Sequence, residues 1–167
     1  GGAFLGFGYW KSTKGWECKP LEDRKKRLYT KCKAVLVRKR AAARPLSETI
    51  RKLNEIIRGW INYYRIGSMK QFMDKFGQWL RHKVRVVIVK QWKKPKRIYL
   101  NLQKLNRIFK CKMTEEDIFK VANSRLGWYK RCAMNVVNFL LSPKVLAIPN
   151  RKRRRPGLID PLAYYLS

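Results

Sequence analysis

Apolar residues recur at helical spacing along most of this chain. Between residues 47 and 67, five of them are separated by three, four, three and four residues and form one stripe on a helix: Ile50, Leu53, Ile57, Trp60 and Tyr64. Ser47 is suited to cap the start of this helix, Glu48 to occupy its first turn, and Gly67 to follow its end at the C′ position. The pattern predicts an amphipathic helix with one buried face.

Two more helices are expected on either side of this one. The segment 21–40 carries a thin apolar seam made by Leu21, Leu28, Cys32 and Val35. The segment 69–93 carries a fuller stripe made by Met69, Phe72, Met73, Phe76, Leu80 and Val87. Pro95 closes that helix, and we interpret "KKPKR" as a hinge or linker.

The C-terminal part has weaker helical signals. Thr114 and Asp117 resemble a capping box with Asp in place of Glu, which predicts a helix from Glu115 to about Ser124. A further helix is expected over 128–141, stopped where Ser142 precedes a proline.

The N-terminus differs from the rest because it is rich in aromatic residues at strand spacing. We interpret "AFLGFGYW" and "WECKP" as two strands joined by a turn at Lys14 and Gly15. The predicted fold class is therefore mainly α: an N-terminal β-hairpin over 1–20, a helical bundle over 21–95, and a small basic helical domain over 96–167. A hairpin of this kind needs a surface to pack on.

Charge changes the interpretation of the helices. Forty-one Lys and Arg oppose ten Asp and Glu, for a net charge of +31, which favours a polyanionic partner such as nucleic acid. Nine of these cations lie in 21–40 and eight in 81–97, so each segment predicts a basic strip on its solvent face. A third concentration is the run of cations over 151–155, which favours a disordered arm or a nucleic-acid contact.

A membrane is not the expected partner. A spanning helix needs about 20 apolar residues, and the longest apolar run, Val84 to Val89, is interrupted by Arg85. The N-terminus "GGAFLGFGYW" lacks the basic region of a signal peptide, so the expected compartment is the cytoplasm.

Metal chemistry is not expected either. Cys18, Cys32, Cys111 and Cys132 are widely spaced, with no C-x-x-C pair, and His82 is the single histidine. A zinc site would need these isolated ligands to converge, so free thiols are the better explanation. His82 is expected at the surface of a basic face rather than as a general base.

The stretch "IIRGWINYYRIGSM" combines aromatic residues with a glycine in the middle of a predicted helix. Such a glycine costs about 1 kcal/mol relative to alanine, so Gly59 predicts that another backbone or a nucleic-acid strand passes close by. Trp60 and Tyr64 lie on the apolar stripe and are expected in the core. For Tyr63, packing and contact with a sugar-phosphate backbone remain equally open.

Five motifs resemble a known family in their order along the chain: "AFLGFGYW", "LNEIIRGWINYYRIG", "WLRHKVRVVIVKQWKKPK", "NSRLGWYKR" and "GLIDPLAYY". The first is similar to the last strand motif of the polymerase palm in bacterial group II intron-encoded reverse transcriptases. The other four resemble the maturase-specific region that follows the palm in those proteins. The resemblance covers nearly the whole chain.

The resemblance implies a thumb over 21–95 that grips the template-primer duplex and binds intron RNA to support splicing and reverse transcription. It implies that residues 96–167 contact target DNA, and that the protein is bacterial and cytoplasmic. The residues expected to bind nucleic acid are Arg24, Lys25, Arg27, Lys31, Arg38, Arg58, Asn62, Tyr63, Arg65, Arg81, Arg85, Lys90, Lys93, Lys94, Arg125, Lys130, Arg151, Arg153 and Arg154. If the two helical strips face one groove, five to eight phosphate contacts should give a salt slope near −5.

The departures from the family's pattern bear on catalysis. The Tyr-Ala-Asp-Asp box that holds the catalytic metal ions does not occur in this sequence, and one histidine cannot supply a His-Asn-His nuclease. No catalytic residue and no cofactor is therefore expected in this chain, and Mg²⁺ is expected only with the missing palm.

A rival interpretation is a stand-alone basic RNA- or DNA-binding protein. A severed palm edge should leave Phe4, Phe7 or Trp10 exposed and open to self-association, whereas a stand-alone protein should cover these rings.

Overall fold

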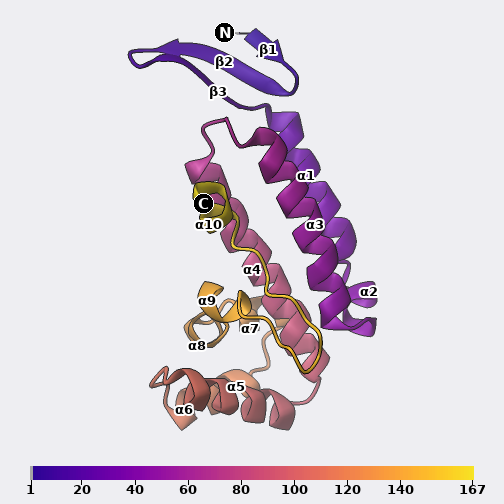
Figure 1. Ribbon diagram of the computed structural model, residues 1–167. Coiled ribbons are helices and arrows are strands. Elements are labelled where there is room, and N and C mark those ends of the chain that lie inside the picture. Colours follow the sequence, from indigo (N-terminus) through magenta and orange to yellow (C-terminus); the bar gives the residue numbers. More distant parts are fainter. Residues whose placement is uncertain (1) are drawn as a thin grey trace.

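We describe a computed structural model covering residues 2–167, apart from the side chain of Arg38. A small sheet lies at one end of the molecule, long helices run away from it, and a group of shorter helices lies at the far end (Figure 1). This arrangement confirms the predicted mainly α fold class with strands at the N-terminus.

The N-terminal sheet has three antiparallel strands where two were predicted: β1 (Gly2–Phe4), β2 (Phe7–Ser12) and β3 (Gly15–Pro20), in that order. The segment taken as one strand reverses at Leu5 and Gly6, whose φ angles are 53° and 86°. Two positive φ values in a two-residue loop suit a hairpin turn, and the glycine adopts one of them without strain. The second turn places Thr13 and Lys14 between the paired Ser12 and Gly15, one residue earlier than predicted.

The segment 21–40 forms two helices rather than one: α1 (Glu22–Val35) and α2 (Arg38–Ala43). Leu36 ends α1, where its amide donates to the carbonyls of Cys32 and Lys33, and it buries its side chain. Val37 then takes an extended ψ of 120° before α2 starts. Burial of Leu36 turns the chain toward the core, so the helix ends before residue 40, where the sequence predicted it to end.

The two strongest helical predictions are confirmed by α3 (Leu46–Tyr64) and α4 (Lys70–Trp92). All five residues of the α3 stripe are buried, and the α4 stripe is buried except for the half-buried Phe72. The caps differ from expectation because α3 begins at Leu46, one residue before Ser47, and has Arg65 as its C-cap, two residues before Gly67.

An aromatic cluster joins the sheet to α1, α3 and α4. Phe7 of β2 packs against Tyr64, with ring centroids 5.1 Å apart, and Tyr64 lies 4.6 Å from Trp60. Tyr29 of α1 meets Trp79 of α4 edge-on at 4.8 Å. Because such pairs add to the stabilisation from burial, the cluster fixes the sheet on the bundle.

The far end contains five short or medium helices: α5 (Pro95–Phe109), α6 (Glu115–Ala122), α7 (Trp128–Cys132), α8 (Asn135–Leu140) and α9 (Pro143–Leu146). The last helix of the chain is α10 (Pro161–Leu166). The interpretation of "KKPKR" as a linker was wrong for Pro95, which is the first residue of α5, a favourable place for proline. The capping prediction is confirmed, since the Thr114 hydroxyl accepts from the Asp117 amide at 3.1 Å. The helix predicted over 128–141 is interrupted at Met134, whose ψ is 144°.

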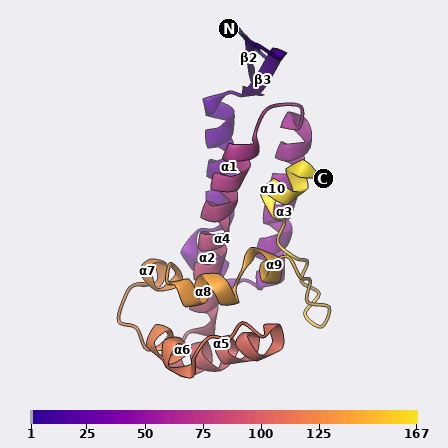
Figure 2. The same cartoon turned by 90° about the vertical axis from the view of Figure 1, so that its left-hand side faces the viewer.

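The C-terminal segment returns to the long helices instead of staying at the far end, and α10 packs beside α3 and α4 (Figures 1 and 2). Asn54 of α3 holds this segment: its side-chain amide donates to Gly157 O at 2.8 Å and accepts from Ile159 N at 3.0 Å. Gly77 of α4 faces the same segment: a Cβ there would lie 2.9 Å from Arg81 Nη1 and in ordinary contact, 3.4 Å, with Pro161 Cδ. The chain thus brings its C-terminal helix back to the bundle formed by α3 and α4.

Candidate nucleic-acid interface

A groove of about 530 Å³ lies between α1, α3 and the turn after β1. Three cations of α1 line one side of it, Leu5 of the turn after β1 lines its end, and one acid with apolar and aromatic residues of α3 lines the other side. The lining residues are Leu5, Arg24, Arg27, Lys31, Glu55, Ile56, Gly59, Trp60, Tyr63 and Tyr64. It brings together four residues that the sequence predicts to bind nucleic acid, namely Arg24, Arg27, Lys31 and Tyr63.

The cationic wall follows one face of α1. Arg24, Arg27 and Lys31 are spaced by three and four residues, so they follow one another over about 10 Å of helix. Arg27 and Lys31 are exposed, and within residues 2–167 no ion pair involves either of them. The Nε of Arg24 is 3.9 Å from Asp23 Oδ2 and makes no hydrogen bond in the part of the chain described. Most of this charge is therefore not compensated within the protein.

Lys25 differs from its neighbours on α1. Its Nζ lies 3.2 Å from Glu22 Oε1 and 5.1 Å from the centre of the Phe72 ring. Its charge is therefore directed toward α4 and an acid, and it does not line the groove.

The opposite wall comes from α3. The Trp60 indole donates to Arg24 O at 3.2 Å, which ties the two walls together. Trp60 and Tyr64 are buried, as predicted. Tyr63 is 57% exposed, although its ring stacks on Phe7 at 6.2 Å and its hydroxyl donates to Leu5 O at 3.1 Å. Tyr63 therefore both packs and presents a surface to the groove.

Gly59 directly precedes Trp60 on α3, lines the groove and faces open space. Apart from its two chain neighbours and the adjoining backbone of α3, no atom of the described chain lies within 4 Å of the position a Cβ would take. The expectation that another protein backbone packs there was wrong, and the alternative, a nucleic-acid strand, stays a prediction.

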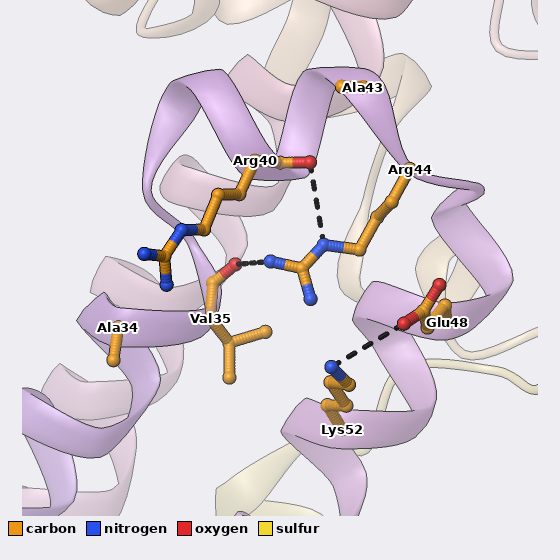
Figure 3. A pocket seen from close by; sticks show the side chains of 7 residues that line it. All are labelled: Ala34, Val35, Arg40, Ala43, Arg44, Glu48 and Lys52. Atoms are coloured by element: carbon orange, nitrogen blue, oxygen red, sulfur yellow. Dashed lines mark hydrogen bonds and ion pairs between the residues drawn. The ribbon is translucent and has the colours of Figure 1, made fainter.

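A second hollow, of about 450 Å³, lies where α1, α2 and α3 meet. Figure 3 shows Arg44 reaching across it to donate to Val35 O at 3.1 Å, while Lys52 pairs with Glu48 at 3.4 Å. Because these two cations are committed to internal partners, the hollow presents less free charge than the groove.

The basic strip predicted over 81–97 is not continuous. Residues 84–89 are buried on every side, because α2 covers α4 on one side and α7 on another. Arg85 is inside this region and its Nε donates to Leu141 O at 2.7 Å. Burial is the main reason that the pKa of Arg85 is lowered to about 10, and the positive charge of nearby Arg81 also lowers it. Arg81 is paired with Asp160 at 3.6 Å.

Two other predicted binding residues hold the C-terminal helix. Asn62 accepts from the hydroxyl of Tyr164 at 3.0 Å, and Arg65 donates to Ser167 O at 2.9 Å. The Arg65 guanidinium also lies 5.0 Å from the centre of the Tyr164 ring. No pattern in the sequence indicates that these polar groups face α10.

The remaining predicted residues lie away from the groove, except Arg58, which is exposed on α3 next to Gly59. Lys90 is half-buried, whereas six other cations are exposed on the α4–α5 junction, on the α6–α7 region and in the 150–155 turn: Lys93, Lys94, Arg125, Lys130, Arg151 and Arg153. Arg154 is exposed in the same turn, where its carbonyl accepts from Arg51 at 3.3 Å. The side chain of Arg38 lies outside the described residues.

His82 is half-buried rather than at the surface. Its ring meets Tyr129 edge-on at 4.0 Å, and its Nε2 is buried with no hydrogen-bond partner in the described chain. Burial is the main cause that lowers the pKa of His82, and the positive charges of Lys83 and Arg85 also lower it. A neutral ring without an acceptor nearby is a packing group.

The acids and thiols form no metal cage. Among the described residues, no three His, Cys, Asp or Glu side chains lie close enough together to hold an ion. Burial raises the pKa of the Cys32 thiol to about 12, which keeps it protonated. In the same part of the chain, no helix has the length and apolar character needed to cross a bilayer.

Sequence reasoning missed several residues that shape this interface. Leu5, Glu55 and Ile56 line the groove, and Asn54 anchors the C-terminal segment. Asn54 had a signal, because it lies one helical turn after Ile50, on the apolar face where a polar side chain needs a buried partner.

Residues 25–107, which include every residue that lines the groove except Leu5 and Arg24, match the family described as group II intron, maturase-specific domain. The chain belongs to this family, as the sequence resemblance predicted. Membership links it to the splicing of group II introns. No curated protein matches the chain.

Proposed function

We propose that this chain is the nucleic-acid-binding thumb and maturase portion of a group II intron reverse transcriptase. It binds intron RNA and the RNA template–DNA primer duplex through the α1–α3 groove. The observation that carries the proposal is the row of Arg24, Arg27 and Lys31 facing the exposed ring of Tyr63, in which Arg27 and Lys31 make no ion pair within the described residues. Cations supply phosphate contacts and an aromatic ring supplies a stacking surface.

We further propose that the chain performs no catalysis itself and works with a polymerase palm that holds Mg²⁺. The sheet supports this proposal because Phe4 is 64% and Trp16 is 72% exposed, although Phe7 is buried and Trp10 half-buried. Exposed large rings on a small sheet favour a covering partner. Self-association through the β1 or β3 edge is the alternative way of covering them, and sedimentation velocity distinguishes a dimer from a monomer.

For the far end we propose contact with target DNA. Its exposed cations come from the α6–α7 region and from the 150–155 turn, which an Asn150–Arg155 bridge closes. They therefore project from ordered backbone. A bacterial cytoplasmic location belongs to the same proposal.

The test is a salt titration of binding, using fluorescence anisotropy with a group II intron RNA, a simple RNA duplex and an RNA–DNA hybrid. We expect affinity for all three to fall steeply with salt, with a slope of about −3 or steeper. We expect tighter binding to the intron RNA, because simple A-form duplexes are recognised mainly by shape. A slope shallower than about −2 on every ligand would refute the proposal, as would equal affinity for heparin and intron RNA.

A further inference from the structure

Gly59 is unusual among the described glycines because it lies in the middle of a helix and no atom beyond its own stretch of helix lies within 4 Å of where a Cβ would be. Gly6, by contrast, takes a φ of 86° in a turn, and a Cβ at Gly77 would lie 2.9 Å from Arg81 Nη1. Gly59 has an ordinary helical backbone and open space where a side chain would be. Glycine weakens a helix there without any gain that the protein itself supplies.

The position of Gly59 in the groove suggests what the open space is for. Arg24, Arg27 and Lys31 line the facing helix, and Tyr63 lies one helical turn further along α3. A ligand in this groove would meet cations on one side and an aromatic ring and bare helix backbone on the other. These are the groups that recognise a sugar-phosphate chain.

We propose that the groove between α1 and α3 holds the backbone of one nucleic-acid strand, and that Gly59 is the point where the sugar lies directly on helix α3. The absence of a side chain lets the strand come close enough for its phosphates to reach Arg27 and Lys31. This inference rests on the proposed function, since it specifies where in the basic surface the strand lies.

The other walls of the groove limit the alternatives. Among the described residues, Glu55 is the one acid that lines it, and it lies one helical turn before Gly59, at the end away from Tyr63. An acidic peptide would also be attracted by the cations, but an extended peptide gains much of its affinity by adding a strand to a sheet edge, which the side of a helix does not offer. A phosphodiester strand needs only the charges and the close approach.

The experiment compares Gly59→Ala and Gly59→Leu with Gln71→Leu in the full chain. Gln71 is exposed on α4 and does not line the groove, so Gln71→Leu controls for an added apolar side chain. The probes are a single-stranded RNA, a single-stranded DNA of the same sequence and an RNA duplex, each measured by anisotropy over a range of salt concentrations.

Because alanine has a higher helix propensity than glycine, Gly59→Ala should raise Tm by about 2–4 °C. It should nonetheless weaken binding, so stability and affinity move in opposite directions. Gly59→Leu should displace one or two phosphate contacts, which lowers affinity at 0.1 M salt by about 8- to 60-fold and reduces the steepness of the salt slope by about one to two. Gln71→Leu should bind like the parent chain.

Two different failures can be told apart. If the parent chain shows no salt-dependent binding to any probe, the proposed function is wrong and this inference with it. If the parent binds and Gly59→Leu binds within twofold of it on every probe, only the placement of the strand at Gly59 is overturned. Loss on RNA but not on DNA would support the inference and assign the contact to the ribose 2′-hydroxyl.

Discussion

Removing two charges from the groove should have a larger effect on binding than removing two charges from the opposite side of the same helix. The perturbed pair is Arg27→Gln with Lys31→Gln, on the groove wall. The control pair is Lys26→Gln with Lys33→Gln. Lys26 and Lys33 are exposed and seven residues apart, so they share a face of α1, and neither lines the groove.

The magnitude follows from counterion release. Each phosphate contact contributes about −0.9 to the salt slope on a duplex, so loss of two contacts should make the slope shallower by about 1.8. At 0.1 M salt that corresponds to about 60-fold weaker binding, or about 2.5 kcal/mol. The control charges lie a helix diameter away, about 10 Å, which is also the screening length at this salt concentration. We expect the control slope to change by less than about 0.5.

The assay is anisotropy on the RNA duplex between 50 and 300 mM salt, with thermal unfolding as the check on folding. Exposed substitutions of this kind should change the free energy of unfolding by less than about 0.5 kcal/mol. Equal losses for the groove pair and the control pair would mean that the chain binds through overall charge, and the groove would lose its assigned role.

Three further predictions concern the interior. Asn54→Ala leaves Gly157 O and Ile159 N without partners, so we expect the free energy of unfolding to fall by about 2–4 kcal/mol, measured by thermal unfolding. We also expect faster proteolysis of the C-terminal segment, measured by mass spectrometry of the fragments. Unchanged cleavage would show that Asn54 does not hold that segment. The lowered pKa of His82 means that the unfolded chain binds its proton first, so stability should decrease as pH falls through about 6.5, the unfolded value. His82→Gln should flatten the dependence measured by urea unfolding from pH 7.5 to 5.5, and an unaltered profile would contradict this. Cys32, with its pKa raised to about 12, should resist labelling by a thiol reagent at pH 8 until the protein unfolds, whereas the half-buried Cys18 should react first. Equal labelling rates would contradict this burial.

Periodicity predicted α3 and α4 well because their stripes are long and the buried positions are apolar. It failed where one residue changes the path of the chain. Leu36 ends α1 by turning inward, and Leu5 with Gly6 reverses a strand that otherwise has a continuous aromatic pattern. Such turns are decided by tertiary burial or by φ at one or two positions, which hydrophobic spacing does not record.

The groove was predictable only in part. A row of cations on α1 is visible in the sequence, but the partner helix that forms the other wall is not. For α4 the same cationic composition was misleading, because Arg81 and Arg85 satisfy internal groups. An arginine's charge indicates a polar partner, and only the fold decides whether that partner is a carboxylate, a carbonyl or a ligand.

The return of α10 to α3 and α4 has a consequence for biosynthesis. The hydrogen bonds of Asn54 join residues 103 and 105 positions apart. The bundle therefore cannot be completed until the ribosome has made the C-terminal segment. At about 5–20 residues per second, α3 waits for roughly 5–20 s after it emerges before its partner exists. During that interval the cationic wall of α1 is already present, and a transcript nearby could occupy it before the protein has finished folding.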